Sequence, residues 1–167
     1  MLSILSRLLQ EHKKEIIFFA SLFILDRLIK NYLLNLLAEN QLNSIRLNNF
    51  FEVVLVWNKG ISYGLFPQES YIGQILIILV SLIICIWITK FIIISETKYR
   101  KITLILILSG ATSNIFDRLI YGAVADLFHF EIASYSWYVF NVADVYIVSG
   151  LIILIYAFIY PNIKKKP

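Results

Sequence analysis

The stretch YIGQILIILVSLIICIWITKFIII, from Tyr71 to Ile94, decides the fold class of this chain. Lys90 is its one charged residue, and branched aliphatic side chains fill most of the other positions. About 20 consecutive apolar residues, wound as an α-helix, cross the roughly 30 Å of hydrocarbon in a bilayer. The stretch therefore predicts a helix that spans a membrane.

Three further segments have the same apolar character, at residues 16–37, 102–120 and 142–160. Of the 167 residues, 59% are hydrophobic and 16% are charged. A soluble domain is about half apolar and about a quarter charged. We therefore expect an all-α polytopic membrane protein with four transmembrane helices, forming a single domain over residues 1–167.

The lysines and arginines indicate the orientation of the chain. If successive spans alternate in direction, ten of the fifteen basic residues fall on one side: Arg7, Lys13, Lys14, Lys90, Lys98, Arg100, Lys101, Lys164, Lys165 and Lys166. The loops on the other side hold only Arg46, Lys59 and Arg118. Because cytoplasmic flanks are the basic ones, we expect both ends in the cytoplasm. The N-terminus lacks the cleavage site of a secretory signal peptide, so the first span is expected to stay in the protein.

The two outer loops differ in character. In the first, residues 38–70, the segments around Ile45 and at residues 51–57 are rich in β-branched and aromatic side chains, with turn residues between them. This pattern predicts a small β-element on the outer membrane surface. The second, residues 120–138, carries Trp137 and several Tyr and Phe residues, and we expect it to lie along the interface.

Placing a polar residue in or beside a membrane span costs free energy, so the polar residues found there indicate functional positions. The predicted topology brings one set of them to the outer boundary from four separate segments: Asn58, Gly60, Asn114, Asp117, Arg118, Asp126, Asn141 and Asp144. No comparable cluster occurs in the sequence on the inner side. This convergence favours a functional site.

Asp126 and Asp144 lie on the segments that enter and leave one short outer loop. Two carboxylates held close together in a poorly hydrated place cannot both ionise easily, so the pair offers a general base and a general acid at once. Such a pair can activate water against an amide without a metal or a nucleophilic serine. A plainer reading of Asp144 is a helix cap and dipole partner.

We expect no cofactor and no metal. His12 and His129 fall on opposite sides of the membrane in the predicted topology, and the single cysteine, Cys85, lies between isoleucines inside a span. This excludes a disulfide framework and a site built from several cysteines.

Plainer roles are also open for the other polar residues. Asp117 and Arg118 are suited to anchoring a span at the interface, and the three asparagines to hydrogen bonding between helices. Asp26 and Lys30, spaced i and i+4, favour a structural ion pair. A small proton-coupled transporter or channel is the alternative function, but its polar residues should spread through the bilayer depth. A non-catalytic scaffold does not account for the aspartate pair.

With these motifs in this order, the chain resembles the lipoprotein signal peptidases (type II signal peptidases), aspartyl peptidases of the bacterial cytoplasmic membrane. The resemblance covers nearly the whole chain. Asp26 and Lys30 are similar to the family's Asp-x-x-x-Lys, and residues 58–60 to its Asn-x-Gly, with Tyr63 at an aromatic position. Asn114, Asp117 and Arg118 match the family's Gly-Asn-x-x-Asp-Arg, and Asp126 matches its first catalytic segment. The family's Phe-Asn-x-Ala-Asp is matched by Phe140, Asn141, Ala143 and Asp144.

Two departures from the family pattern carry expectations. Ser109-Gly110 replaces the glycine pair and Ser113 replaces the glycine before Asn114, which predicts slightly looser or shifted packing of the third span. Leu127 replaces the phenylalanine after the first catalytic aspartate, which predicts a different pocket wall.

The resemblance implies that Asp126 and Asp144 are catalytic, and we keep the structural role that the i, i+4 spacing favours for Asp26 and Lys30. It implies that substrate is bound, or the pair supported, by Asn58, Gly60, Asn114, Asp117, Arg118 and Asn141. The implied reaction removes the signal peptide of a prolipoprotein by cleavage just before a diacylglyceryl-modified Cys, at the outer face of the bacterial inner membrane. The implied partners are this substrate and membrane lipids, with no nucleic acid, and a monomer is expected to be functional.

Overall fold

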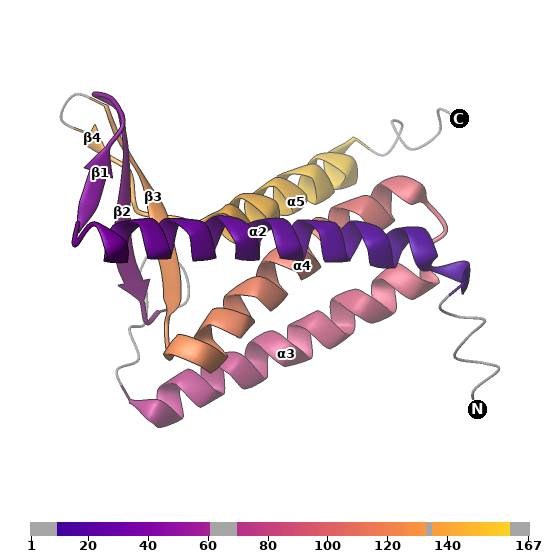
Figure 1. The fold of residues 1–167 in the computed structure, drawn as a ribbon. Helices are drawn as coiled ribbons and strands as arrows, with labels where there is room; N and C mark the ends of the chain where they lie inside the picture. The colour runs from indigo at the N-terminus through magenta and orange to yellow at the C-terminus, as the bar shows by residue number, and fades with distance from the viewer. Residues whose placement is uncertain (1–9, 61–69, 133–134, 161–167) are drawn as a thin grey trace.

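The computed structural model describes residues 10–60, 70–132 and 135–160. Its four long helices are α2 (Lys13–Glu39), α3 (Tyr71–Ile94), α4 (Lys98–Tyr121) and α5 (Val142–Ile159), and a small sheet stands across one end of them (Figure 1). Successive helices run in opposite directions. The end of α2, the start of α3, the end of α4 and the start of α5 therefore lie at the end of the bundle where the sheet stands (Figure 1).

Within the described residues, α3, α4 and α5 are long and apolar enough to cross a membrane. The fourth helix, α2, has 27 residues but carries Asp26, Arg27 and Lys30 near its middle, so its composition alone does not mark it as a span. These three side chains are buried inside the protein. The helix-rich membrane fold expected from the sequence is thus confirmed for three helices.

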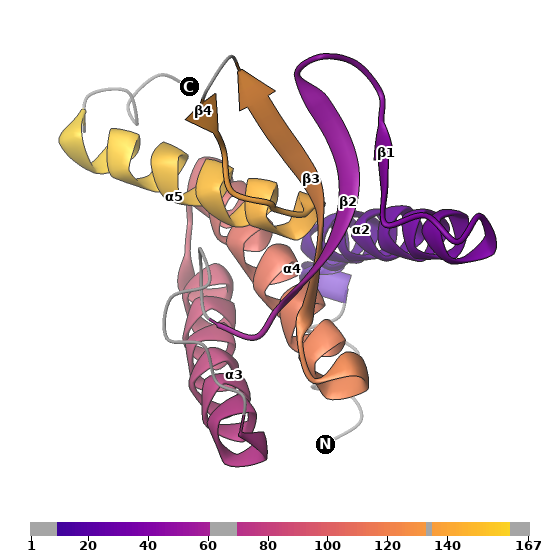
Figure 2. The ribbon, with the colours of Figure 1, turned by 90° about the vertical axis from the view of Figure 1, so that its left-hand side faces the viewer.

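Helix α4 lies at the centre of the bundle and packs against α2, α3 and α5 (Figure 2). Most of α4 is buried, whereas α3 and α5 turn apolar side chains outward along most of their length. Two glycines allow α4 and α5 to approach closely. A Cβ on Gly110 would collide with the carbonyl oxygen of Ala143, and one on Gly150 would lie 2.6 Å from Ile107 Cγ1. Gly110, the glycine that remains of the family's pair, therefore lies at a tight α4–α5 contact, and the looser packing predicted from Ser109 and Ser113 stays a prediction.

The helix ends nearest the sheet are capped by their own sequence. Asn141 and Asp144 form a reciprocal capping box at the start of α5, in which each side chain accepts from the other's backbone N–H. Helix α4 ends at Gly122, whose φ of 72° is the left-handed conformation that suits glycine. This turn leads directly into the strand that carries Asp126.

The sheet is antiparallel, in the order β1-β2-β3-β4, with bounds Ser44–Arg46, Phe51–Asn58, Val124–Ile132 and Tyr135–Ser136. Strands β1 and β2 confirm the β-element predicted in the first outer loop. The second outer loop was expected to lie along the interface, but it supplies β3 and β4. Val56 of β2 pairs with Asp126 of β3, so Asp126 lies on a strand inside the sheet.

A hydrophobic cluster joins the sheet to the end of α2. Leu33 and Leu37 of α2 pack with Val53 of β2 and Leu127 of β3. Because successive side chains on a strand point to opposite faces, Leu127 faces this cluster and Asp126 faces away from it. The prediction that Leu127 alters the wall of the pocket is therefore wrong: Leu127 is a core residue of the sheet–helix contact.

Candidate active site

Asp126 and Asp144 are brought together by Asn141, which lies immediately before α5. The Asn141 side chain donates from Nδ2 to Asp126 Oδ1 at 2.6 Å, and its backbone N–H donates to Asp144 Oδ2 at 3.2 Å. Asp126 is 3% exposed, whereas Asp144, in the first turn of α5, is half-buried. One asparagine therefore fixes the relative position of both carboxyl groups.

Two further asparagines bind the remaining carboxylate oxygens. Asn58, at the end of β2, donates from Nδ2 to Asp126 Oδ2 at 3.0 Å. Asn114, on α4, donates from Nδ2 to Asp144 Oδ1 at 2.9 Å. All four carboxylate oxygens thus accept an N–H from a neutral amide. Among the described residues, neither aspartate forms an ion pair with a lysine or arginine.

The surroundings of Asp126 favour its protonated form. Burial is the main cause, the nearby charge of Asp144 adds to it, and together they raise the pKa of Asp126 to about 7. The amides of Asn58 and Asn141 act in the opposite direction because they stabilise the ionised carboxylate. The environment of Asp126 therefore makes its carboxyl group easier to protonate than an ordinary aspartate.

A second pair of aspartates, Asp26 on α2 and Asp117 on α4, has the opposite environment. Asp117 accepts from Arg27 Nη1 at 2.5 Å and from Lys30 Nζ at 2.6 Å. Lys30 also lies 3.4 Å from Asp26 Oδ2. Both carboxylates are 0% exposed. Each of these aspartates is therefore paired with a cation, and the pairs tie α2 to α4.

This ionic cluster supports the backbone beside each amide-bound aspartate. The N–H of Ala143, which precedes Asp144, donates to Asp26 Oδ1 at 2.9 Å. The N–H of Ala125, which precedes Asp126, donates to Asp117 Oδ2 at 3.3 Å. Lys30 Nζ also donates to Asn114 Oδ1 at 3.1 Å, which orients the amide of Asn114 toward Asp144. The predicted pairing of Asp26 with Lys30 is present, as one part of a larger network.

Arg118 and Gly60 complete the described part of the site. Arg118 Nη2 donates to the carbonyl oxygen of Gly60 at 2.6 Å, and the Gly60 N–H donates to Asn58 Oδ1 at 2.9 Å. Arg118 thereby holds the backbone that follows β2 beside the asparagine that binds Asp126. Tyr63, the aromatic position noted in the sequence, lies outside the described residues.

Two residues of the network carried no role in the sequence analysis. Arg27 binds Asp117 and lies over the ring of Phe116, 5.1 Å from its centroid. Ser113 is 0% exposed and donates from its hydroxyl to Asp26 Oδ2 at 2.5 Å. The sequence did hold a signal for Arg27: it lies inside one apolar segment, and a possible partner, Asp117, lies inside another. Ser113 gave only the signal that it replaces a glycine.

The histidines and the cysteine lie away from these carboxylates. His129 Nε2 is 2.8 Å from Ser136 Oγ at the edge of the sheet, His12 precedes α2 at the other end of the bundle, and Cys85 is buried on α3. Within residues 10–60, 70–132 and 135–160, no three His, Cys, Asp or Glu side chains come together as a set of metal ligands.

A helical membrane protein with two adjacent carboxyl groups, one of them readily protonated, has the elements of a membrane-embedded aspartic peptidase. The chain matches the family model described as signal peptidase (SPase) II over residues 18–160. It therefore belongs to the signal peptidase II family and is a peptidase.

Curated relatives and solved structures agree with this assignment. Proteins named lipoprotein signal peptidase from Nitrobacter hamburgensis and Pelagibacter ubique are 40% and 37% identical to the chain. The first alignment covers 86% of this chain and 91% of the relative, and the second covers 86% of each. A solved bacterial membrane enzyme has the same fold, with a TM-score of 0.76 over 92% of both chains at 22% identity.

Proposed function

We propose that Asp126 and Asp144 are the catalytic dyad of this peptidase. The observation that carries the proposal is that amides, and no cation within ion-pair distance among the described residues, bind both carboxyl groups. Amides hold the groups in place without fixing either of them in the ionised state. Asn58, Asn114 and Asn141 are the residues that orient the pair.

The dyad divides two proton tasks between its members. One carboxylate removes a proton from water as the water oxygen attacks the carbonyl carbon of the substrate. The other, protonated, gives its proton to the carbonyl oxygen. When the tetrahedral intermediate collapses, the C–N bond breaks, the amine leaves with a proton from the dyad, and a carboxylic acid remains.

Arg118 and Gly60 are the proposed contacts to the substrate backbone. Arg118 is 7% exposed, and its Nε has no hydrogen-bond partner among the described residues although it is buried. An unpaired buried donor is costly, and a substrate carbonyl oxygen would satisfy it. The Gly60 carbonyl accepts from Arg118 Nη2, which keeps the guanidinium beside Asn58, a ligand of Asp126.

The proposed substrate is a prolipoprotein whose Cys already carries a diacylglyceryl group, cut at the peptide bond just before that Cys. The support is the name lipoprotein signal peptidase shared by relatives that align over most of this chain. A site where the membrane helices meet the sheet suits such a substrate. Its lipid chains can remain in hydrocarbon while water reaches the scissile bond.

We further propose that α2 is a fourth span and that residues 1–167 form a single domain of the inner membrane, with both termini in the cytoplasm and the site at the outer face. A helix of 27 residues is about 40 Å long, enough to cross the bilayer. Its charged side chains are buried and paired with α4, so they need not face lipid. The monomer, which contributes all the residues of the site, is the proposed functional unit.

The test of function is cleavage by the detergent-purified protein of a prolipoprotein that carries the diacylglyceryl group, compared with the same precursor without it. We expect cleavage of the modified precursor alone, with a lipid-bearing Cys as the new N-terminus. Equal cleavage of both precursors would contradict the proposed substrate. Ion flux in reconstituted vesicles without any cleavage would favour a transporter.

Reporter fusions test the topology. An enzyme active only in the cytoplasm, fused after Lys166, should be active, and a periplasmic reporter at the same site should be silent. The reverse pattern would contradict the four-span arrangement while leaving the proposed dyad untouched.

A further inference from the structure

Helices α2 and α3 both pack along α4 but scarcely touch each other (Figure 2). The space between them, at the end of the bundle away from the sheet, is an apolar groove of about 730 Å³. Its floor belongs to α4 and its walls to α2 and α3; its apolar lining includes Ile16, Phe19, Cys85, Ile86, Ile105 and Leu108.

The length and the apolar lining of the groove suit a hydrocarbon chain. Along α3 it extends from Leu82 to Ile94, a rise of about 18 Å, close to one leaflet of a bilayer with ~30 Å of hydrocarbon. Its walls on α2 and α3 and its floor on α4 are mostly apolar, so an extended acyl chain lying along α3 contacts aliphatic side chains for this whole length.

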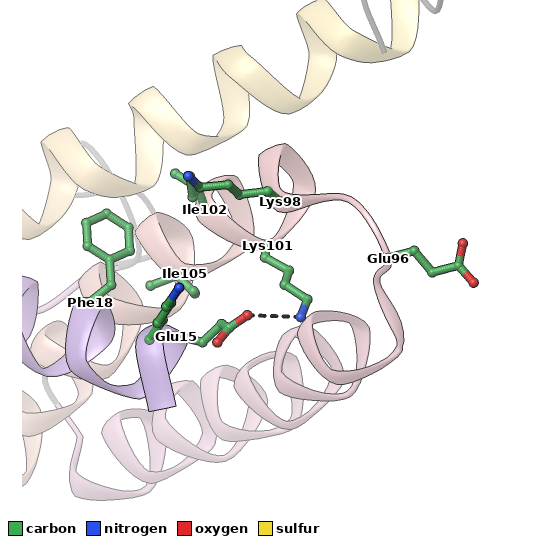
Figure 3. A pocket seen from close by; sticks show the side chains of 8 residues that line it. Glu15, Phe18, Glu96, Lys98, Lys101, Ile102 and Ile105 are labelled. Atoms are coloured by element: carbon green, nitrogen blue, oxygen red, sulfur yellow. Dashed lines mark hydrogen bonds and ion pairs between the residues drawn. The ribbon is translucent and has the colours of Figure 1, made fainter. Parts of the chain in front are cut away.

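A second cavity, of about 440 Å³, adjoins the groove and shares Glu15 and Ile105 with it. Three lysines line it, Lys14 on α2 and Lys98 and Lys101 at the start of α4. Figure 3 shows Lys101 bound to Glu15, with Nζ and Oε1 2.9 Å apart, and the Glu96 carboxylate pointing away from the other side chains. Lys14 and Lys98 form no ion pair among the described residues, so the cavity favours an anion.

The junction of groove and basic cavity also offers a hydrogen-bonding group. His12 lines the groove at this end, and its Nδ1 is buried without a hydrogen-bond partner among the described residues. The site therefore matches the parts of a phospholipid in order. The apolar groove, one leaflet deep, suits an acyl chain, the unpaired imidazole nitrogen suits the polar glycerol region, and the lysines suit the anionic headgroup.

We propose that this site binds one anionic phospholipid of the inner leaflet, with an acyl chain between α2 and α3 and the phosphate at Lys14 and Lys98. The leaflet rests on the proposed orientation of the chain, and the site is separate from the dyad. Basic side chains at the cytoplasmic ends of spans attract anionic lipid headgroups. The lipid fills a gap that α2 and α3 leave open on α4.

The single cysteine provides the readout, because Cys85 lines the groove. The purified full chain is titrated in micelles with phosphatidylglycerol or with phosphatidylcholine of the same acyl chains, and the rate of Cys85 alkylation by N-ethylmaleimide is measured. We expect phosphatidylglycerol to protect Cys85 at the lower mole fraction. The double variant Lys14→Gln/Lys98→Gln should need about 30-fold more phosphatidylglycerol for the same protection.

The matched control is Lys13→Gln/Arg100→Gln, which removes the same charge from neighbouring positions that line neither cavity. It should behave like the unchanged protein, and both double variants should cleave substrate at the normal rate. Equal protection by the two lipids, an equal loss in the control, protection by inorganic phosphate alone, or alkylation insensitive to lipid would each overturn the proposal. None of these outcomes bears on the dyad, whose failure would appear only in cleavage.

Discussion

Two pairs of aspartates lie in one region of the molecule and have opposite environments. Asp26 and Asp117 are 0% exposed and are bound by Lys30 and Arg27. Asp126 and Asp144 are bound by asparagine and backbone amides. The comparison shows how one small region holds carboxylates in two environments. Lysine and arginine bind the first pair, the anchors between α2 and α4, whereas neutral amides bind the second pair.

The two pairs are also connected through backbone hydrogen bonds. The anchors hold the N–H groups of Ala143 and Ala125, each immediately before one member of the second pair. A change in the anchors should therefore be felt first as lost stability, and a change in the second pair first as lost catalysis. The predictions below test that division.

The largest expected effect is on catalysis by the second pair. Asp126→Asn and Asp144→Asn keep the shape of each side chain but remove its proton transfer, a contribution typically worth ~10²–10⁴-fold in rate. The double variant should be little worse than either single one, because the dyad acts as a unit. Single-turnover cleavage of lipid-modified precursor measures this, with thermal unfolding in detergent as the check on folding. Near-normal cleavage by either Asn variant would remove that residue from the dyad and leave Asp117 as the next candidate.

The next effect is on the stability of the anchors. Asp117→Asn leaves Lys30 with Asp26 as its remaining acidic partner and leaves Arg27 with none among the described residues; breaking such a buried pair typically costs about 3–5 kcal/mol. The free energy of unfolding should fall by this order, whereas Asp126→Asn should change it little. Glu131→Gln is the matched control, because its ion pair with Arg46 lies on the surface and should be worth less than about 1 kcal/mol. A stable but inactive Asp117→Asn protein would move Asp117 into the catalytic machinery.

A smaller effect is expected at Ser113. Ser113→Ala removes the hydroxyl that donates to Asp26, and a hydrogen bond to a charged group contributes about 1.5–3 kcal/mol. Stability should fall, with the cleavage rate of the folded protein reduced far less than in the dyad variants. Thr112→Ala, next along the helix, is the control, because the Thr112 hydroxyl bonds only to carbonyl oxygens of its own helix. A Ser113→Ala protein as stable as the Thr112→Ala protein would show that the serine adds nothing to the anchor.

The smallest effect is a shift in pH dependence. Cleavage needs one protonated and one ionised carboxyl group, so activity should fall as Asp126 loses its proton, with a midpoint near its pKa of about 7. The Asn58 amide lowers that pKa, so Asn58→Ala should move the alkaline fall to higher pH by less than about one unit. Asn48→Ala, in the β1–β2 turn, should leave the profile unchanged. A shift to lower pH in Asn58→Ala would contradict the assigned hydrogen bond.

The sequence by itself determined the class of fold and the residue set of the candidate site. Apolar runs long enough to cross a bilayer leave few other structures, because backbone groups in lipid must bond within a helix or closed barrel. The candidate site residues were recognisable because they are polar and lie at the ends of those runs: Asn58, Asn114, Asp126, Asn141 and Asp144. Placing a polar side chain at the membrane costs free energy, so such a residue indicates a functional role.

Only the tertiary structure decided how those residues divide their roles. The pairing of β3 with β2 turned an expected loop into a strand and directed Asp126 and Leu127 to opposite faces. The packing of α2 on α4 brought Arg27 and Ser113 to Asp117 and Asp26. An aspartate bound by cations differs from one of the proposed dyad in the donors that lie within about 3 Å, and those donors come from segments far apart in the chain.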